Sequence, residues 1–402
     1  MGRLSFSGRS LLAAAVLLCG IASAVGAQDA TPADSLIGYT QFRVNLPGGR
    51  HANASTMRAH VVRGDGSAPR EVAAELIPNA DTWTQFAGWS PDGETAIIGC
   101  GWQDPENAVW EEEHKTFRMA NGGWTYDMHT LDLPTGKIVN VTAVERVSPY
   151  NSGLFYWPNN SAQFGFQALI DGVSHPYRMD RDGRNKVDLS SGADGFTYGF
   201  NASSDGKRIA YHKNYQIYLA DADGSNAVHV ETGNPFNFAP TWSPDGQSLV
   251  FVSGEHYDCH PHIVRRDGSG LKKIGDRNGY RGVVTIFDVF DFHGGSSDLP
   301  VWSPDSQSVI FARQTGKAET QLFRTMLEGK TNQLTHSKPG TLNYHPVVHP
   351  SGERIVFGST RSGTRQLYVL DLESGKVHAV TDVPVGHGAM WPHWQPRLSI
   401  TR

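Results

Sequence analysis

The stretch of this sequence best suited to chemistry is a run rich in histidine and acidic side chains. It spans residues 255–262 and reads Glu-His-Tyr-Asp-Cys-His-Pro-His. On a strand, His260 and His262 point to the same face, because side chains alternate with a period of two. Imidazole together with carboxylate oxygen suits a divalent ion such as manganese, calcium or zinc. The run predicts a metal site that includes His256 and His260, with a structural hydrogen-bonded cluster or a substrate contact as alternatives.

A second candidate is the pair His212-Lys213, which lies 44 residues before His256. Histidine suits a general base because its pKa lies near neutrality. Lys213 is expected to bind a carboxylate or to act as a second base. The alternative is that both residues end a strand in solvent.

A third group of candidates lies next to X-Pro pairs in the second half of the chain. Trp391 is expected to stack on a sugar ring, and the others supply polar groups at the rim of a channel. The alternative is a set of polar side chains around a wet channel. The group contains Asp298, Tyr344, His345, Trp391 and His393, with His293 and His387 nearby.

A repeated Trp-Ser-Pro-Asp-Gly motif must position these residues. Strong copies begin at Trp89, Trp242 and Trp302, and each is followed by an alternating apolar run and a turn. Such alternation with Asp-Gly turns is typical of an antiparallel meander. Spacings near 40–46 residues are typical of four-stranded propeller blades. The tryptophan-equivalent positions are 89, 157, 202, 242, 302, 348 and 394.

Seven repeats predict an all-β fold, a seven-bladed β-propeller closed by N-terminal strands. The last motif, at Trp394, lies too near the C-terminus to complete a blade, so residues 37–76 are expected to supply the missing strands. Closure of this kind removes open sheet edges. The runs 208–211 and 249–251 are expected to be innermost strands, and the long spacers 101–123 and 275–298 to carry function.

The first 27 residues resemble a secretory signal peptide. Arg3 and Arg9 precede an apolar stretch over residues 11–21, and small residues lead up to Ala27. We therefore expect residues 1–27 to be a signal peptide, residues 28–402 to be one propeller domain, and the protein to be periplasmic or secreted. No later stretch has the roughly 20 apolar residues that span a bilayer, so no transmembrane segment is expected.

The net charge argues against a nucleic-acid partner, and the cysteine content argues against a disulfide scaffold. The formal net charge is −5 and the sequence has no basic run, so nucleic acid is not an expected partner. Beyond the signal peptide the cysteines are Cys100 and Cys259, which allows one bridge and excludes a disulfide scaffold.

At its Trp-Ser-Pro-Asp-Gly motifs the chain resembles the TolB-type (PD40) propeller repeat over residues 37–396. It is more distantly similar to oligogalacturonate lyases, which are TolB-like propellers that cleave uronate oligosaccharides by β-elimination with a His base and a divalent metal. That resemblance implies His212 as the base, and His256 and His345 as metal ligands. The sequence departs from the lyase pattern where a Gln is expected within 342–344, and at Val347, where a second His is expected.

The leading hypothesis is an exported lyase, assisted by a divalent metal, that acts on an acidic oligosaccharide or another small saccharide. The alternative is a non-catalytic TolB-like propeller that binds an envelope protein partner. A glycoside hydrolase is a third possibility, which needs two convergent carboxylates. Its candidates are Glu111–Glu113, Asp258, Asp291 and Asp298.

Overall fold

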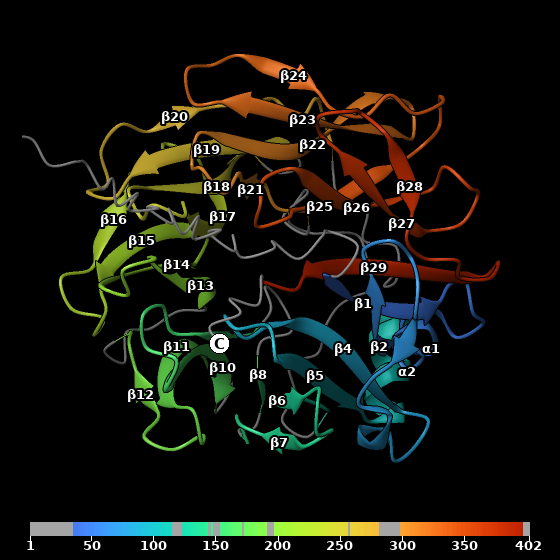
Figure 1. Ribbon diagram of the computed structural model, residues 1–402. Helices are drawn as coiled ribbons and strands as arrows, with labels where there is room; N and C mark the ends of the chain where they lie inside the picture. Colours follow the sequence, from blue (N-terminus) through green and yellow to red (C-terminus); the bar gives the residue numbers. More distant parts are fainter. Residues whose placement is uncertain are drawn as a thin grey trace, which may run out of the picture. The chain divides into compact units, whose positions relative to one another are not determined.

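The fold is a seven-bladed β-propeller. The computed structural model describes residues 35–114, 123–143, 146–147, 153–170, 173–190, 197–255, 258–280 and 298–396. These residues belong to one compact unit, and their strands form seven antiparallel sheets arranged around an axis (Figure 1). The predicted fold class is confirmed.

We number the blades from the one that closes the ring. Blade 1 contains β29 (His387–Trp394), β1 (Leu36–Arg43), β2 (Arg58–Arg63) and β3 (Arg70–Glu71). Blade 2 contains β4 (Thr82–Trp89), β5 (Thr95–Gln103), β6 (Trp124–Asp132) and β7 (Ile138–Asn140). Blade 3 contains β8 (Arg146–Val147), β9 (Leu154–Tyr156), β10 (Gln163–Ile170), β11 (Val173–Asp180) and β12 (Val187–Asp188). Blade 4 contains β13 (Thr197–Ala202), β14 (Arg208–Lys213), β15 (Gln216–Asp221) and β16 (Val228–Val230).

The other three blades repeat this plan. Blade 5 contains β17 (Phe236–Trp242), β18 (Ser248–Glu255), β19 (Asp258–Arg265) and β20 (Lys272–Lys273). Blade 6 contains β21 (Val301–Trp302), β22 (Ser308–Gly316), β23 (Glu319–Met326) and β24 (Thr331–Gln333). Blade 7 contains β25 (Asn343–Val348), β26 (Arg354–Ser359), β27 (Gln366–Asp371) and β28 (Val377–Ala379).

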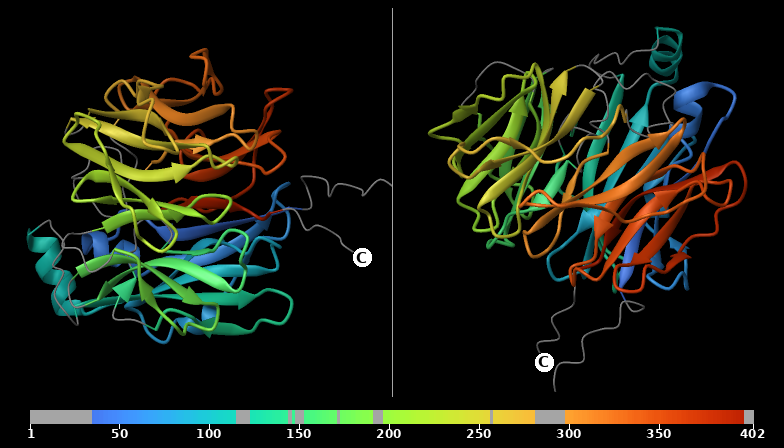
Figure 2. Two further views of the ribbon diagram at one scale, coloured as in Figure 1. Left: turned by 90° about the vertical axis from the view of Figure 1, so that its left-hand side faces the viewer. Right: turned by 90° about the horizontal axis from the view of Figure 1, so that it is seen from above.

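In the described ranges, three short helical segments interrupt the strands. They are α1 (Gly49–Ala54), between β1 and β2, α2 (Pro105–His114), between β5 and β6, and the 3-10 turn η1 (Ala74–Leu76). Helix α2 lies in the long spacer 101–123 and stands out from the ends of the strands (Figure 2). Among the helices that the structure describes, none has the length and hydrophobicity needed to cross a bilayer.

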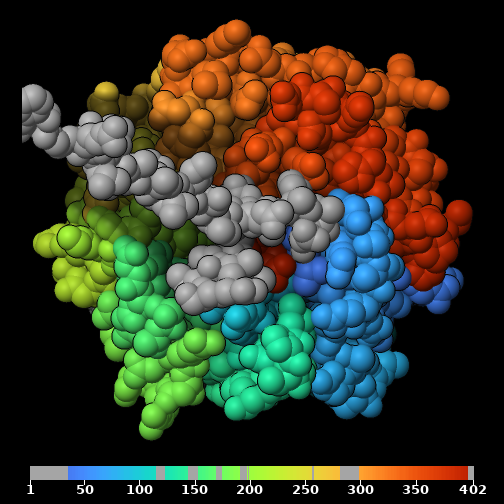
Figure 3. All heavy atoms as spheres, in the orientation of Figure 1, coloured from blue at the N-terminus to red at the C-terminus, as the bar shows by residue number. Residues whose placement is uncertain are grey.

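The two ends of the propeller close the ring in blade 1, as the sequence predicts. The C-terminal strand β29 pairs antiparallel with β1, with Ile37 opposite Trp394 and Arg43 opposite His387. Figure 3 shows the first described residues, in blue, against the last described residues, in red. Ile37 and Trp394 are buried at this seam, so closure contributes apolar packing as well as hydrogen bonds.

The interpretation of residues 208–211 and 249–251 as innermost strands is wrong. They belong to β14 and β18, which are the second strands of their blades, while β13 and β17 lie nearer the axis (Figure 1). A second strand pairs on both edges and is covered by neighbouring blades on both faces. It therefore has the strongest apolar pattern, which does not reveal which strand lines the axis.

The repeat tryptophans bridge neighbouring blades. Three of them donate the indole N–H to a backbone carbonyl oxygen on the first strand of the preceding blade. The bonds are Trp302 to Thr241 (3.0 Å), Trp394 to Val347 (3.2 Å) and Trp89 to His393 (3.0 Å). These bonds fix the position of one first strand along the next.

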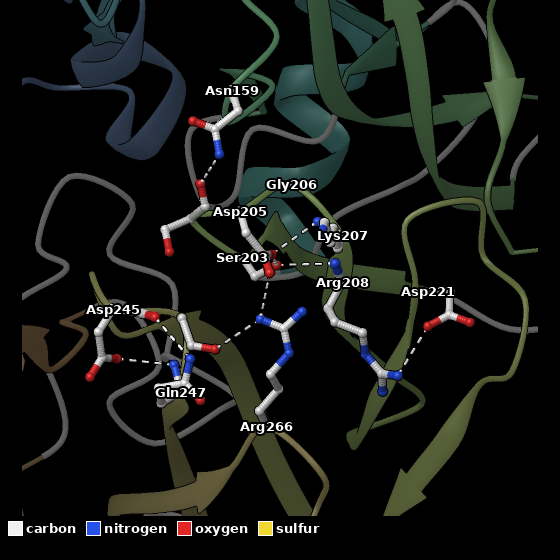
Figure 4. A network of polar contacts seen from close by, with 12 residues as sticks. Asn159, Ser203, Asp205, Gly206, Lys207, Arg208, Asp221, Asp245, Gln247 and Arg266 are labelled. Atoms are coloured by element: carbon white, nitrogen blue, oxygen red, sulfur yellow. Dashed lines mark hydrogen bonds and ion pairs between the residues drawn. The ribbon is translucent and has the colours of Figure 1, made fainter.

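The turns between first and second strands also join blades, and Figure 4 shows the network at one of them, the Ser-Ser-Asp-Gly turn 203–206 of blade 4. Ser203 Oγ and the amide of Lys207 both donate to Asp205, at 2.6 and 3.1 Å, while Arg266 of the next blade reaches its other oxygen at 2.9 Å. Gly206 supplies the positive φ (67°) that the turn requires. Partial burial alone raises the pKa of the Asp205 carboxyl, but the hydrogen bonds and the Arg266 charge outweigh it and lower the pKa to about 2.

The possible disulfide does not form. Cys100 lies on β5 in blade 2 and Cys259 on β19 in blade 5, and both thiols are free. The spacing of two cysteines along the sequence does not show whether their side chains lie within bonding distance, because that depends on which blades contain them.

We predict that Trp302→Phe lowers the free energy of unfolding by about 1 kcal/mol, because the inter-blade hydrogen bond to Thr241 is lost while the ring is kept. Urea denaturation measures this change. Trp242→Phe is the matched control, since within the described ranges Trp242 Nε1 is buried and has no hydrogen-bond partner. Equal losses in both variants would show that packing volume, rather than the bond, stabilises the seam.

Candidate functional site

Most of the candidate residues lie toward one end of the strands, and His393 lies toward the other. Neighbouring strands in each blade are antiparallel, so the first strand begins where the second strand ends. We call this end the loop face, and the opposite end, with the Ser-Pro-Asp-Gly turns, the turn face. Lys213 ends β14 at the loop face, Asp298 precedes β21 there, and α1 and α2 lie on the same face.

A bulge interrupts the first strand of several blades. In blades 4, 5, 7 and 1 the residue at the bulge has a positive φ, between 47° and 60°. Only glycine adopts this conformation readily, and a side chain there costs about 1–2 kcal/mol. Blades 4 and 5 have small residues at this position, whereas blades 7 and 1 have large rings. The four residues are Gly199, Ala239, His345 and Trp391.

The two rings lie against each other across the seam between blades 7 and 1. The centroids of His345 and Trp391 are 6.2 Å apart with an interplanar angle of 26°. The Phe42 ring also lies near Trp391, with 6.2 Å between the centroids and an interplanar angle of 29°. Trp391 is half-buried and His345 is 8% exposed. We call His345 and Trp391 the ring pair. Both residues lie within the first strands of their blades, β25 and β29. Their place next to X-Pro pairs had suggested instead that they precede those strands.

The buried carboxylate of Asp298 holds the backbone of His345, one of the two residues of the ring pair. The amide of His345 donates to Asp298 Oδ1 at 3.2 Å, and the hydroxyl of Tyr280 donates to Asp298 Oδ2 at 2.5 Å. The Arg277 guanidinium lies 4.5 Å from the centre of the Tyr280 ring. Burial, followed by the Asp298 charge, raises the pKa of Tyr280 well above its usual value, so its hydroxyl remains a donor.

This network extends to the histidine-rich run in blade 5. The amide of Arg277 donates to His260 Nδ1 at 3.2 Å, and His260 Nε2 lies 3.2 Å from Asp258 Oδ1. Burial lowers the pKa of His260, so the imidazole is neutral and both of its ring nitrogens are engaged. His262 lies two residues further along β19, where its Nδ1 donates to the backbone oxygen of His260.

The described residues do not fit the predicted metal site. Of the three expected ligands, His256 lies outside the described residues, and His260 has both nitrogens engaged. Within the ranges that the structure covers, no three His, Cys, Asp or Glu side chains gather closely enough to hold an ion. We therefore derive no chemical step from a metal.

The expected base, His212, lies on β14 and is 4% exposed. Its Nδ1 accepts the amide hydrogen of Ala239, at the bulge of the next blade, at 3.1 Å. The edge of its ring meets Phe238. Because a neutral imidazole has one acceptor nitrogen, His212 takes up a proton only when this bond is released. Lys213, the next residue, is half-exposed.

His393 lies apart from the ring pair, two residues further along β29. It lines a cavity of about 270 Å³ together with Trp89, Pro91 and Tyr156, close to a Ser-Pro-Asp-Gly turn. Burial lowers the pKa of His393 to about 4.

The remaining candidates either lie outside the described residues or make contacts away from the ring pair. His293 and Asp291 lie outside the described residues. Tyr344 is fully buried against Gly358, and Arg365 lies over its ring. Glu111 forms a buried ion pair with Arg50 between α2 and α1.

Sequence reasoning missed Arg277 and Tyr280. Both lie on a loop-face segment between blades. The antiparallel order of the strands would have placed those loops beside the X-Pro positions.

Known proteins share this fold. Residues 212–399 match the protein-family model described as TolB beta propeller domain, PD40. The matched segment contains the strands of blades 5, 6 and 7. The chain is 30% identical over 173 residues to the Tol-Pal system protein TolB of Bordetella pertussis, and this match covers 42% of this chain and 35% of that protein. An uncharacterized protein of Agrobacterium fabrum is 29% identical over 161 residues, covering 39% of this chain and 53% of that protein. The chain thus spans about a third to a half of the length of these relatives.

A solved oligogalacturonate lyase in complex with manganese has a similar structure. It is 14% identical, with a TM-score of 0.55, and the match covers 88% of this chain and 89% of the lyase. At this identity the likeness concerns the fold alone.

We predict that the stability of this propeller falls as pH decreases from about 6.5 to about 4, in part because of His393. The folded-state pKa is lower than the unfolded value, so its contribution is present above pH 6.5 and is lost as pH falls toward 4. The contribution is about 1–3 kcal/mol. Urea denaturation at pH 7 and pH 4.5 should show a smaller pH dependence in His393→Gln than in the parent. An unchanged dependence would contradict this assignment.

Proposed function

We propose that this TolB-type propeller is an exported carbohydrate-active protein that binds an acidic oligosaccharide at the ring pair and cleaves it by β-elimination. The observation that carries the proposal is the strain at the ring pair. Two bulky residues occupy left-handed positions where blades 4 and 5 have Gly199 and Ala239. Strain of this kind persists at binding and catalytic sites, because selection for function maintains it.

The chemistry of the ring pair supports a sugar as the ligand. A half-buried indole offers an apolar face, and the imidazole beside it adds a polar edge. The buried Tyr280–Asp298 contact fixes the amide of His345, so the pair is held in place before a ligand arrives. The resemblance to oligogalacturonate lyases supports a uronate as the sugar.

β-Elimination requires a base that removes the proton next to the uronate carboxylate. The electrons of that C–H bond form a double bond as the bond to the leaving oxygen breaks. His212 remains the proposed base, with Lys213 as the partner of the carboxylate. In this proposal His212 releases the amide of Ala239 before it accepts the proton.

A second candidate function is non-catalytic binding of an envelope protein partner. Two observations favour it. The acceptor nitrogen of His212 is occupied, and within the described part of the chain no three potential ligands converge on a metal site. The matched segment of TolB from Bordetella pertussis is consistent with this function.

The experiment that tests the proposal follows unsaturated product by its absorbance at the edge of the ultraviolet, with oligogalacturonate and with other uronate oligomers, in the presence and absence of manganese. We predict turnover by the parent protein. His212→Asn should abolish it while the fold is kept, because Asn still offers an oxygen to the Ala239 amide but cannot act as a base. Trp391→Ala should lower kcat/KM about tenfold or more.

Ala239 shows that alanine is compatible with the bulge, so Trp391→Ala is expected to fold. No product from any uronate oligomer under either condition would overturn the lyase proposal. Capture of an envelope protein by the same preparation would then favour the non-catalytic function.

A further inference from the structure

The turn after the first strand identifies equivalent residues in different blades. In blade 2 the amide of Ser90 donates to the backbone oxygen of Thr95 at 2.8 Å, and Trp89 comes directly before this turn. We call the residue before the turn the seam position, because its side chain packs between two blades. The equivalent backbone bond places a tryptophan at the seam position of three other blades. These residues are Trp242, Trp302 and Trp394.

Blade 3 differs from this pattern by one residue. The amide of Trp157 donates to the backbone oxygen of Gln163 at 2.9 Å, so Trp157 is the equivalent of Ser90, and Tyr156 takes the seam position. Side chains alternate along a strand, and Trp157 therefore faces the other seam of its blade. There its indole N–H donates to the backbone oxygen of Gly206 in blade 4 at 3.2 Å.

At three seams the indole at the seam position donates to the blade before it. The acceptor is the backbone oxygen of the residue that precedes that blade's own seam position, namely His393, Thr241 or Val347. In blade 2 the corresponding residue is Gly88, and blade 3 supplies Tyr156 at its seam position. A phenol ring is smaller than an indole and has no N–H to donate to this carbonyl.

A cavity lies at this seam. It has a volume of about 270 Å³, and its walls include Gly88 and Trp89 of blade 2 and Phe155 and Tyr156 of blade 3. Gly88, Trp89 and Phe155 are half-exposed, so the cavity is open to solvent. An apolar protein cavity of about 150 Å³ binds benzene, and the larger volume here admits a bicyclic ring.

The lining of the cavity favours an uncharged aromatic ligand. Aromatic rings line it on the sides of blades 2 and 3, and such rings bind another ring by offset or edge-to-face stacking. His393 lines it from blade 1, and its imidazole is neutral at pH 7 because burial lowers its pKa to about 4. A mostly apolar lining with a few polar groups is typical of small-molecule sites.

We propose that this cavity binds an uncharged planar aromatic molecule with an N–H donor, of the chemical class of indole. The ring of the ligand lies among Trp89, Phe155 and Tyr156, and its N–H donates to the backbone oxygen of Gly88. The ligand thereby supplies the contact that the chain's own indoles make at other seams. The site shares no residue with the ring pair, so it does not depend on the proposed function.

The test measures binding to the full chain by calorimetry with indole and with 1-methylindole, which has the same rings but no N–H. The parent should bind one indole per chain, and 1-methylindole about tenfold more weakly, because the hydrogen bond to the Gly88 carbonyl is lost. Absence of indole binding at millimolar concentration, or equal affinity for the two probes, would overturn the proposal.

Tyr156→Trp restores the tryptophan of the repeat and fills the cavity from within the chain. It should weaken indole binding tenfold or more and raise the urea midpoint. Tyr218→Trp is the matched control, since it makes the same change on β15 of blade 4, where Tyr218 stacks on Tyr211. It should keep the parental affinity for indole.

Parental affinity for indole in Tyr156→Trp would show that the ring binds elsewhere, and the proposal would be wrong. If Tyr156→Trp does not fold, the comparison of indole with 1-methylindole on the parent protein decides the outcome.

Discussion

The candidate site depends on one hydrogen bond, from the indole N–H of Trp394 to the backbone oxygen of Val347. This bond joins the first strand of blade 1 to the first strand of blade 7 at 3.2 Å. Trp391 lies three residues before Trp394, and His345 two residues before Val347. The bond between Trp394 and Val347 therefore also sets the relative position of Trp391 and His345. The rings of these two residues meet across the seam. The same indole-to-carbonyl bond recurs at other seams, but among the described residues only this seam has large rings at both bulges.

Closure of the ring makes this alignment possible. Strand β29 comes from the end of the propeller sequence and β1 from its start, so Trp391 is placed only when the first and last parts of the chain have met. The closed ring of blades then holds His345 and Trp391 in their strained left-handed conformation. The Tyr280–Asp298 contact supports His345 from the side of blade 6. The ring pair and its support are thus assembled from blades 6, 7 and 1, whereas the proposed base His212 lies on blade 4.

Much of the fold follows from the sequence, because the repeat sets the blade count and the position of the last motif requires N-terminal strands. The repeat does not tell which strand lies innermost, since a second strand has the stronger apolar pattern. The X-Pro positions located His345 and Trp391, but their left-handed conformation depends on the bulge register between strands. The density of histidines near residue 260 suggested a metal, yet the nitrogens of His260 are engaged by the Arg277 amide and Asp258.

A crystal structure of the protein with bound trigalacturonate tests the central claim most directly. The account predicts one sugar ring stacked on Trp391 beside His345, at the seam between blades 7 and 1. Trigalacturonate bound in the cavity lined by Trp89 and His393, or on another blade, would contradict it.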